Sequence, residues 1–312
     1  MLRQLKTQSS QYGAAIIVAL FVTSIVAIAA VAMIERLRID MRRMTLLQNN
    51  SMAYFYAQGS IAWGLEQLNA NWKDQKPNTV VDHLPLSSPI DEIANVTIQS
   101  TLDSPEGKFN LNNLINSDYD DIFLRLLKLA YPKFNDETAK SLLIGVRDWI
   151  STSENRSQEE YYLKQNPPYR SPHRPMVSVS ELRLVKGVTA DIYQALLPYV
   201  TALPDATKIN VNCAPDLVIQ SLSPTLSKES AQKIVLLRKE HPFASNDAFL
   251  QLDIIKNNTV SDTKISTLSR YFLLKTDVTL SDQHTTLFTL IQRTIKNSKP
   301  EETIIWQSKG TL

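Results

Sequence analysis

The chain has 312 residues, with 33 Lys and Arg against 31 Asp and Glu, so its formal net charge is +2. A charge this close to zero gives no indication of a nucleic-acid partner. The only cysteine, Cys213, excludes an internal disulfide framework and a cysteine-based zinc site.

An uncharged apolar run extends from Ala14 to Ile34. As a helix of about 21 residues it would measure roughly 31 Å, which matches the hydrocarbon core of a bilayer. A short leader with Arg3 and Lys6 precedes the run and ends in Gly13. A secretory signal peptide has its small-residue cleavage site after the apolar region, not before it. We therefore expect a retained, single-pass transmembrane helix, and an ordinary signal anchor is the alternative.

The chain continues without proline from Glu35 to about Trp72, and apolar residues recur there at steps of three or four. This spacing predicts one long helix, half in the membrane and half packed on a soluble domain. Gly59 and Gly64 are candidate points for a bend. The expected apolar stripe consists of Leu37, Met41, Met44, Tyr54, Ala57, Ile61, Leu65, Leu68 and Trp72.

Strands are expected on either side of a long helical region. Residues 73–91 indicate a surface loop, and residues 96–102 alternate as a strand does. Ser104–Gly107 has Pro and Gly where a type I turn prefers them, so we expect residues 108–112 to return as the second strand of a hairpin. Further strands are predicted at 270–278, 285–295 and 303–307.

Between these strands, residues 113–268 follow a helical pattern. Apolar residues recur at helical spacing within 122–130 and 139–149, and Asp120 and Asp121 are placed like the acidic residues of a first helical turn. We therefore expect an α+β fold, in which a large α-helical domain is inserted into one small antiparallel sheet.

The order of basic leader, glycine and retained apolar helix resembles the type IV prepilin class, in which a membrane peptidase cuts after the glycine and methylates the new N-terminus. The resemblance places cleavage between Gly13 and Ala14. Most members have a glutamate at the fifth mature position, where this chain has Val18. Absence of that glutamate is typical of the type II secretion minor pseudopilin K family.

Longer motifs carry the same resemblance. GKFNLN at 107–112 is similar to a signature of that family, and residues 147–200 follow its pattern. The chain is therefore identified as a member of the minor pseudopilin K family. The matching elements are Asp148 and Trp149, Glu159 to Tyr162, Pro167 to Arg170, and Ser178 to Arg183 with Gly187.

The resemblance implies a pilin-like fold, with a transmembrane helix packed on a small antiparallel sheet and an inserted α-domain that is SAM-like or helix-hairpin-helix-like. It divides the chain into a leader (1–13), a transmembrane helix (14–34), a pilin-like helix with the first strands (35–112), the inserted α-domain (113–268) and C-terminal strands (269–312). We expect a subunit at the pseudopilus tip that initiates or caps assembly for the export of folded proteins across the outer membrane.

The same resemblance implies the partners and the location. The expected partners are the minor pseudopilins I and J, the prepilin peptidase and the inner membrane, and exoproteins are further candidates. The protein would be a single-pass inner-membrane protein with its body in the periplasm. No nucleic-acid partner is expected.

Calcium is the cofactor that the resemblance raises, since carboxylate oxygens on a flexible loop suit this ion. This chain has Ser151 and Ser153 where aspartates usually follow the tryptophan. The loss of two carboxylates favours the alternative, a solvated acidic loop. The remaining candidate ligands are Asp148, Glu154, Glu159 and Glu160.

Residues 181–199 and 209–252 look like helix-hairpin-helix units, and the second resembles the unit found in membrane-anchored DNA receptors of competence systems. DNA-binding hairpins use a glycine-rich turn and basic side chains at a phosphate. The turn at 223–229, SPTLSKE, has no glycine. We therefore favour protein interaction, and a membrane-anchored helix-hairpin-helix DNA-binding protein is the alternative function.

An enzyme is not expected. The histidines have no H-E-x-x-H spacing, and neither G-x-S-x-G nor a phosphate-binding glycine loop is present. Cys213 is interpreted as a buried thiol and not as a nucleophile.

Overall fold

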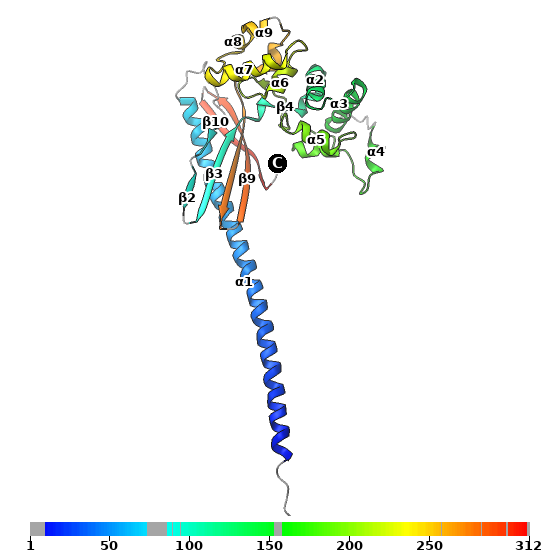
Figure 1. Ribbon diagram of the computed structural model, residues 1–312. Helices are drawn as coiled ribbons and strands as arrows, with labels where there is room; N and C mark the ends of the chain where they lie inside the picture. The colour runs from blue at the N-terminus through cyan, green and yellow to red at the C-terminus, as the bar shows by residue number, and fades with distance from the viewer. Residues whose placement is uncertain are drawn as a thin grey trace, which may run out of the picture.

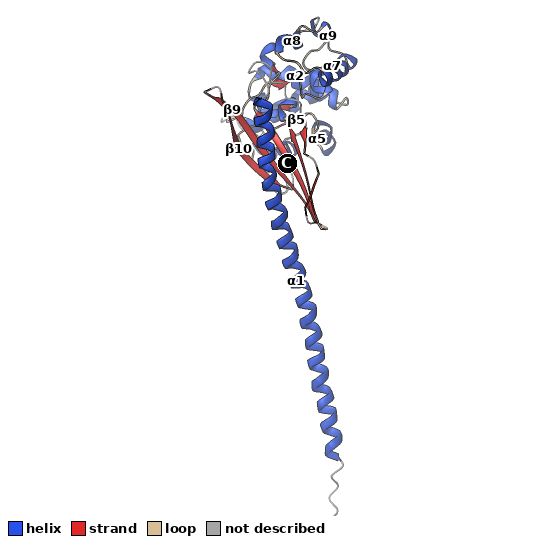
Figure 2. Ribbon diagram, turned by 90° about the vertical axis from the view of Figure 1, so that its left-hand side faces the viewer, coloured by secondary structure: helices blue, strands red, loops and turns tan. Residues whose placement is uncertain are grey.

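The computed structural model describes residues 10–73, 86–88, 90–93, 95–152, 158–256, 258–281, 283–297 and 299–310. One long helix, α1 (Ser10–Lys73), carries a sheet on its C-terminal part. An α-helical domain lies at the end of the molecule opposite the N-terminus (Figure 1). The 64-residue helix measures about 96 Å at the usual rise, and most of it extends clear of the rest of the chain (Figure 2).

The buried stripe of α1 lies only in its C-terminal part. Ala53, Ala57, Ile61, Gly64 and Leu68 are buried, at steps of three and four residues that keep them on one face. The predicted stripe is confirmed at Ala57, Ile61 and Leu68, while Tyr54 and Leu65 are half-buried and the side chain of Trp72 lies outside the described residues. Three predicted members of the stripe, Leu37, Met41 and Met44, are exposed. The helix runs without interruption through Gly59 and Gly64, so the predicted bend is absent.

The main sheet is antiparallel and has the order β1-β3-β8-β9-β10, with β2 paired to β3. The predicted C-terminal strands are confirmed as β8, β9 and β10. The bounds are β1 (Leu86–Ser87), β2 (Asp91–Ile93), β3 (Val96–Asp103), β8 (Tyr271–Leu280), β9 (Gln283–Lys296) and β10 (Lys299–Lys309).

The two faces of this sheet pack on different parts of the molecule. On one face Phe272, Leu274 and Ile291 pack against α1. On the other face Leu290 packs with Leu203, a residue of the α-helical domain. Near the end of the sheet, α1 therefore covers one face, and the α-helical domain contacts the other face through Leu203.

The predicted hairpin is wrong. β3 pairs along its length with β8, and β4 (Phe109–Asn110) pairs in parallel with β5 (Val200–Thr201). The 3-10 turn η1 (Pro105–Gly107) directs the chain off the sheet, because Phe109 is fully buried in the core of the α-helical domain. The predicted loop at 73–91 contains β1 and the first residue of β2, while residues 74–85 lie outside the described residues.

The α-helical domain has one core, built from short helices. Asp120 and Asp121 lie in the first turn of α2, as predicted. The helices are α2 (Asp120–Ala130), α3 (Asp136–Ile150), α4 (Glu159–Leu163), α5 (Ala190–Leu196), α6 (Asp216–Ser221), α7 (Lys228–Glu240), α8 (Asn246–Leu250) and α9 (Asp253–Lys256), with 3-10 turns η2 (Leu111–Ile115), η3 (Ser117–Tyr119), η4 (Val179–Leu184) and η5 (Asp262–Lys264).

This domain consists of two units with the same plan. The first unit, residues 108–203, begins with β4 and ends with β5, and the second unit, residues 208–267, begins with β6 (Ile209–Asn210) and ends with β7 (Ile265–Ser266). In each unit the two strands are parallel. Four described helices lie between them along the chain, α2 to α5 in the first unit and α6 to α9 in the second. The units open with similar sequences, KFNLN and KINVN.

A buried asparagine closes each unit in the same way. The Asn112 amide accepts a hydrogen bond from the Met176 N–H (2.8 Å) and donates to the carbonyls of Met176 (2.9 Å) and Leu203 (2.8 Å). The Asn212 amide accepts from the Phe243 N–H (2.9 Å) and donates to the carbonyls of Phe243 (3.0 Å) and Thr267 (3.1 Å). These two residues therefore tie the start of each unit to its end.

Candidate assembly site

The exposed part of α1, residues 13–48, forms a stalk with no covering element in the described chain. One described helix, α1, is long and apolar enough to cross a membrane, and its most apolar stretch is fully exposed. Val18 is 61% exposed near the start of the stalk. Gly13 and Ala14 lie within α1, whereas leader residues 1–9 lie outside the described residues, so the cleavage position stays a prediction.

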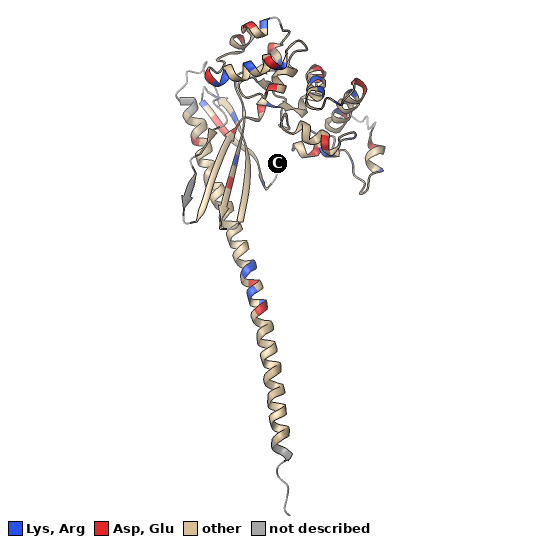
Figure 3. Cartoon of the chain, in the orientation of Figure 1, with Lys and Arg blue, Asp and Glu red and all other residues tan. Residues whose placement is uncertain are grey.

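A band of charge limits the apolar part of the stalk. Figure 3 marks charged residues in one short segment of the stalk, which is residues 35–43 in the sequence. Arg38 lies 3.3 Å from Glu35, and Arg43 lies 3.9 Å from Asp40. The uncharged surface therefore extends from residue 14 to residue 34, which is the length that a bilayer accepts.

The sheet holds α1 through close contact and hydrogen bonds. A Cβ at Gly64 would lie 3.0 Å from Leu274 Cδ2, so the helix and the sheet are in close contact at this glycine. Arg293 is 5% exposed and donates to the Leu68 carbonyl (2.6 Å). Lys309 donates to Asn50 Oδ1 (2.6 Å). The stalk is thus fixed to the sheet at several points along α1.

The α-helical domain is inserted between two neighbouring strands. The chain leaves the sheet after Asp103 on β3 and returns at Tyr271 on β8, and Asp103 pairs with Leu273 across these strands. Because the chain leaves β3 and returns to β8 at the same end of these paired strands, the domain lies at that end of the sheet (Figure 1).

Buried polar groups fix this junction. Glu106 is 3% exposed, and its Oε2 accepts a hydrogen bond from the Arg270 N–H (2.7 Å). The hydroxyls of Ser104 and Ser269 lie 2.5 Å apart, and Asn210 Nδ2 donates to Ser269 Oγ (2.6 Å). The sequence indicates only a turn at residues 104–107, because the partners of this junction are about 165 positions away.

The turn η1, which leads into the first unit, meets the second unit closely where Gly107 contacts Cys213. A Cβ at Gly107 would lie 2.6 Å from the Cys213 carbonyl carbon and oxygen, far inside normal contact distance. Cys213 is half-buried, so burial of its thiol is less complete than predicted. Only glycine fits at this contact.

The candidate calcium ligands do not gather around a common point among the described residues. Glu159 Oε1 accepts from Arg170 (2.7 Å), Glu160 Oε1 accepts from Lys164 (2.5 Å), and Asp148 is half-buried near the end of α3. In the described ranges no three His, Cys, Asp or Glu side chains could share a metal ion. The described members therefore do not fit a tight calcium site. Glu154 lies outside the described residues, so the complete set stays a proposal.

The second helix-hairpin-helix-like segment uses a basic group for its own fold. Its turn connects α6 to α7, and Ser227 caps α7 by accepting from the Ser230 N–H (3.1 Å). Arg238 donates to the Val211 carbonyl (2.7 Å), and burial lowers the pKa of its guanidinium. Arg238 is therefore directed into the protein and not toward an outside phosphate.

Comparisons with known proteins agree with this arrangement. Two family models described as type II secretion system protein K match residues 107–205 and 209–268, bounds that are close to those of the two units. The chain is 29% identical to type II secretion system protein K of Pseudomonas aeruginosa over 302 residues, covering 91% of this chain and 89% of that protein. It is 30% identical to the Klebsiella pneumoniae protein of the same name, over 77% of this chain and 79% of that protein.

A solved structure has the same fold. The crystal structure of the GspK-GspI-GspJ complex from enterotoxigenic Escherichia coli contains a chain that superposes with a TM-score of 0.70 and 21% identity. The match covers 86% of this chain and 100% of the chain in the crystal structure. At 21% identity this similarity concerns the fold, an α-helix packed on a sheet together with an α-helical domain.

Proposed function

Because the chain belongs to the type II secretion system protein K family, and is thus a minor pseudopilin, we propose that it occupies the tip of the pseudopilus. There it would initiate or cap assembly for the export of folded proteins across the outer membrane. The observation that carries the proposal is the position of the α-helical domain, at the end of the molecule opposite the N-terminus of the stalk (Figure 1).

Two features of the chain support a tip position. In a helical filament, the glutamate at the fifth mature position is thought, by analogy with the prepilin class, to pair with the N-terminus of the neighbouring subunit above. Val18 offers no carboxylate at that place. The inserted domain adds bulk beyond the sheet, where a further subunit would have to fit. A subunit with both features accepts neighbours below it but not above it.

We propose minor pseudopilins I and J as its partners, since the related solved structure is a complex of proteins K, I and J. The exposed apolar surface of the stalk is suited to packing against similar helices and lipid. Cleavage and methylation by the prepilin peptidase would act at Gly13 and Ala14. The stalk would anchor the protein in the inner membrane with the body in the periplasm, and exoproteins are further candidate partners.

The role is structural in this proposal, without catalysis. Its working parts would be the leader (1–13), the membrane helix (14–34), the pilin-like helix and first strands (35–112), the inserted domain (113–268) and the closing strands (269–312). The competence-like alternative is less well supported, because its best hairpin lacks a glycine turn and Arg238 is held within the protein.

Restoring the missing carboxylate tests the tip position. We expect Val18→Glu to leave peptidase cleavage intact and to allow the protein to appear along the filament. The new carboxylate, near the start of the membrane helix, can attract the charged N-terminus of the subunit above. The measurement is antibody labelling of pseudopili in cells. Val18→Leu is the matched control and should stay at the tip. A strictly terminal location of the glutamate variant would contradict the proposal.

A further inference from the structure

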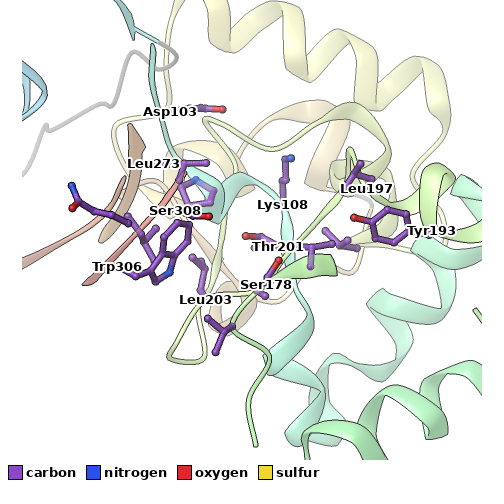
Figure 4. A pocket seen from close by; sticks show the side chains of 17 residues that line it. Asp103, Lys108, Ser178, Tyr193, Leu197, Thr201, Leu203, Leu273, Trp306 and Ser308 are labelled. Carbon is purple, nitrogen blue, oxygen red and sulfur yellow. The ribbon is translucent and has the colours of Figure 1, made fainter. Parts of the chain in front are cut away.

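A groove lies between the α-helical domain and the face of the sheet that does not contact α1. Its volume is about 370 Å³. Figure 4 shows side chains from both parts of the molecule around the same hollow. Its lining includes Lys108, Val177, Leu203, Leu290, Trp306 and Gln307.

The floor of the groove is apolar. Leu203 and Leu290 are each 1% exposed and pack with the half-buried Trp306. At the rim Val177 is 55% exposed and Leu197 is 37% exposed. The groove can therefore bury apolar side chains, and no described part of this chain fills it.

One cation projects into this apolar surrounding. Burial lowers the pKa of the Lys108 ammonium, and the charge of Asp103 offsets part of that effect. Among the described residues the Lys108 ammonium makes no hydrogen bond or ion pair. The Asp103 carboxylate also lines the groove, and its Oδ1 accepts a hydrogen bond from the Ser104 N–H (2.7 Å). Figure 4 places the hydroxyls of Ser178 and Thr201 around the same space. The carboxylate of a ligand in this space would accept a charge-assisted hydrogen bond from the Lys108 ammonium.

The groove also includes residues of the edge strand of the sheet. β10 is the last strand, and no described strand pairs with its outer side. Trp306, Gln307 and Ser308, three consecutive residues of β10, all line the groove. Exposed strand edges accept extended segments through main-chain hydrogen bonds.

We propose that this groove binds an extended, acidic segment of a partner protein, which places apolar side chains over Leu203 and Trp306 and a carboxylate on Lys108. The free edge favours a peptide over a fatty acid, because a fatty acid would leave the β10 backbone groups without partners. The inference goes beyond the tip position and does not depend on it.

The test uses the full chain in detergent and a displayed pool of random peptides as the probe. We expect enrichment of peptides with alternating apolar residues and at least one Asp or Glu. Lys108→Gln should weaken their binding by about tenfold, as expected for loss of a charge-assisted hydrogen bond. Val177→Glu, at an exposed rim position where folding is unaffected, should weaken it as well. Lys299→Gln, an exposed lysine on β10 outside the groove, is the matched control.

Other outcomes would overturn the proposal. These are no enrichment, enrichment without an acidic preference, or binding that is equal in all variants. A dimer that Lys108→Gln dissociates would assign the groove to a second copy of this chain. Displacement of the peptides by palmitate at the same affinity, with no acidic preference, would assign it to a lipid.

Discussion

Replacing Gly107 with alanine is expected to lower the free energy of unfolding by about 3 kcal/mol. The new Cβ would lie 2.6 Å from the Cys213 carbonyl carbon and oxygen and 2.8 Å from the Cys213 Cβ. Two of these atoms belong to the backbone of the second unit, so no side-chain rotation relieves the clash. The chain would have to move η1 away from the second unit at the junction of the α-helical domain with the sheet. Denaturant unfolding of the full chain, followed by tryptophan fluorescence, measures the change.

The matched control is Gly59→Ala. A Cβ at Gly59 meets nothing within 4 Å, and this glycine is exposed on α1. Alanine there should stabilise the helix by up to about 1 kcal/mol, because glycine loses more backbone entropy. Equal effects of the two substitutions on the free energy of unfolding would contradict the close contact between η1 and the second unit.

The second large effect is expected at the asparagines that close the two units. Asn212→Ala removes three hydrogen bonds and leaves the N–H and carbonyl of Phe243 and the carbonyl of Thr267 without their partner. Since Asn212 is 7% exposed, water replaces these bonds poorly. We expect a loss of about 3 kcal/mol, because each unsatisfied buried group costs roughly 1–3 kcal/mol. Asn112→Ala should act equally on the first unit.

Hydrogen exchange locates this effect. The Phe243 amide should lose protection in Asn212→Ala, and the Met176 amide should lose it in Asn112→Ala. Asn116→Ala is the control, since Asn116 caps η3 at an exposed position by accepting from the Asp118 N–H (2.9 Å), and such a cap contributes about 1 kcal/mol. Retained protection of Phe243 in Asn212→Ala would show that this amide does not depend on the asparagine.

Sequence patterns predict this structure well where the signal is local. The apolar run 14–34 needs only its length and composition, and β8, β9 and β10 are consecutive strands with clear alternation. The acidic first turn of α2 and the apolar spacing of α3 also lie within single elements. In each case the residues that decide the structure are close together in the chain.

The wrong hairpin shows the limit of local patterns. Residues 96–112 have the alternation and turn of a hairpin, yet β3 pairs with β8 across the whole inserted domain. Burial of Phe109 in a distant core outweighs the local turn preference. The groove is likewise invisible in sequence, because Lys108, Thr201 and Trp306 come from three separate segments.

The closing asparagines have a usable sequence signal that the predictions missed. KFNLN and KINVN repeat at 108–112 and 208–212, and each is followed later by a proline, an apolar residue and a capping serine. Comparing these segments would have predicted two related units. The hydrogen bonds to Met176 and Phe243 still require the structure, because they join segments that have no pattern of their own.

The most direct test of the tip assignment is complex formation with minor pseudopilins I and J. Burial in α1 begins at Ala53, so a fragment from Arg42 to the C-terminus keeps the buried contacts of α1 with the sheet. We would co-express it with the soluble parts of I and J from the same organism and analyse the product by size exclusion with light scattering. We predict one species with a single copy of each protein. Elution of the fragment alone, together with salt-sensitive binding to duplex DNA, would contradict the tip assignment and favour the competence-like alternative.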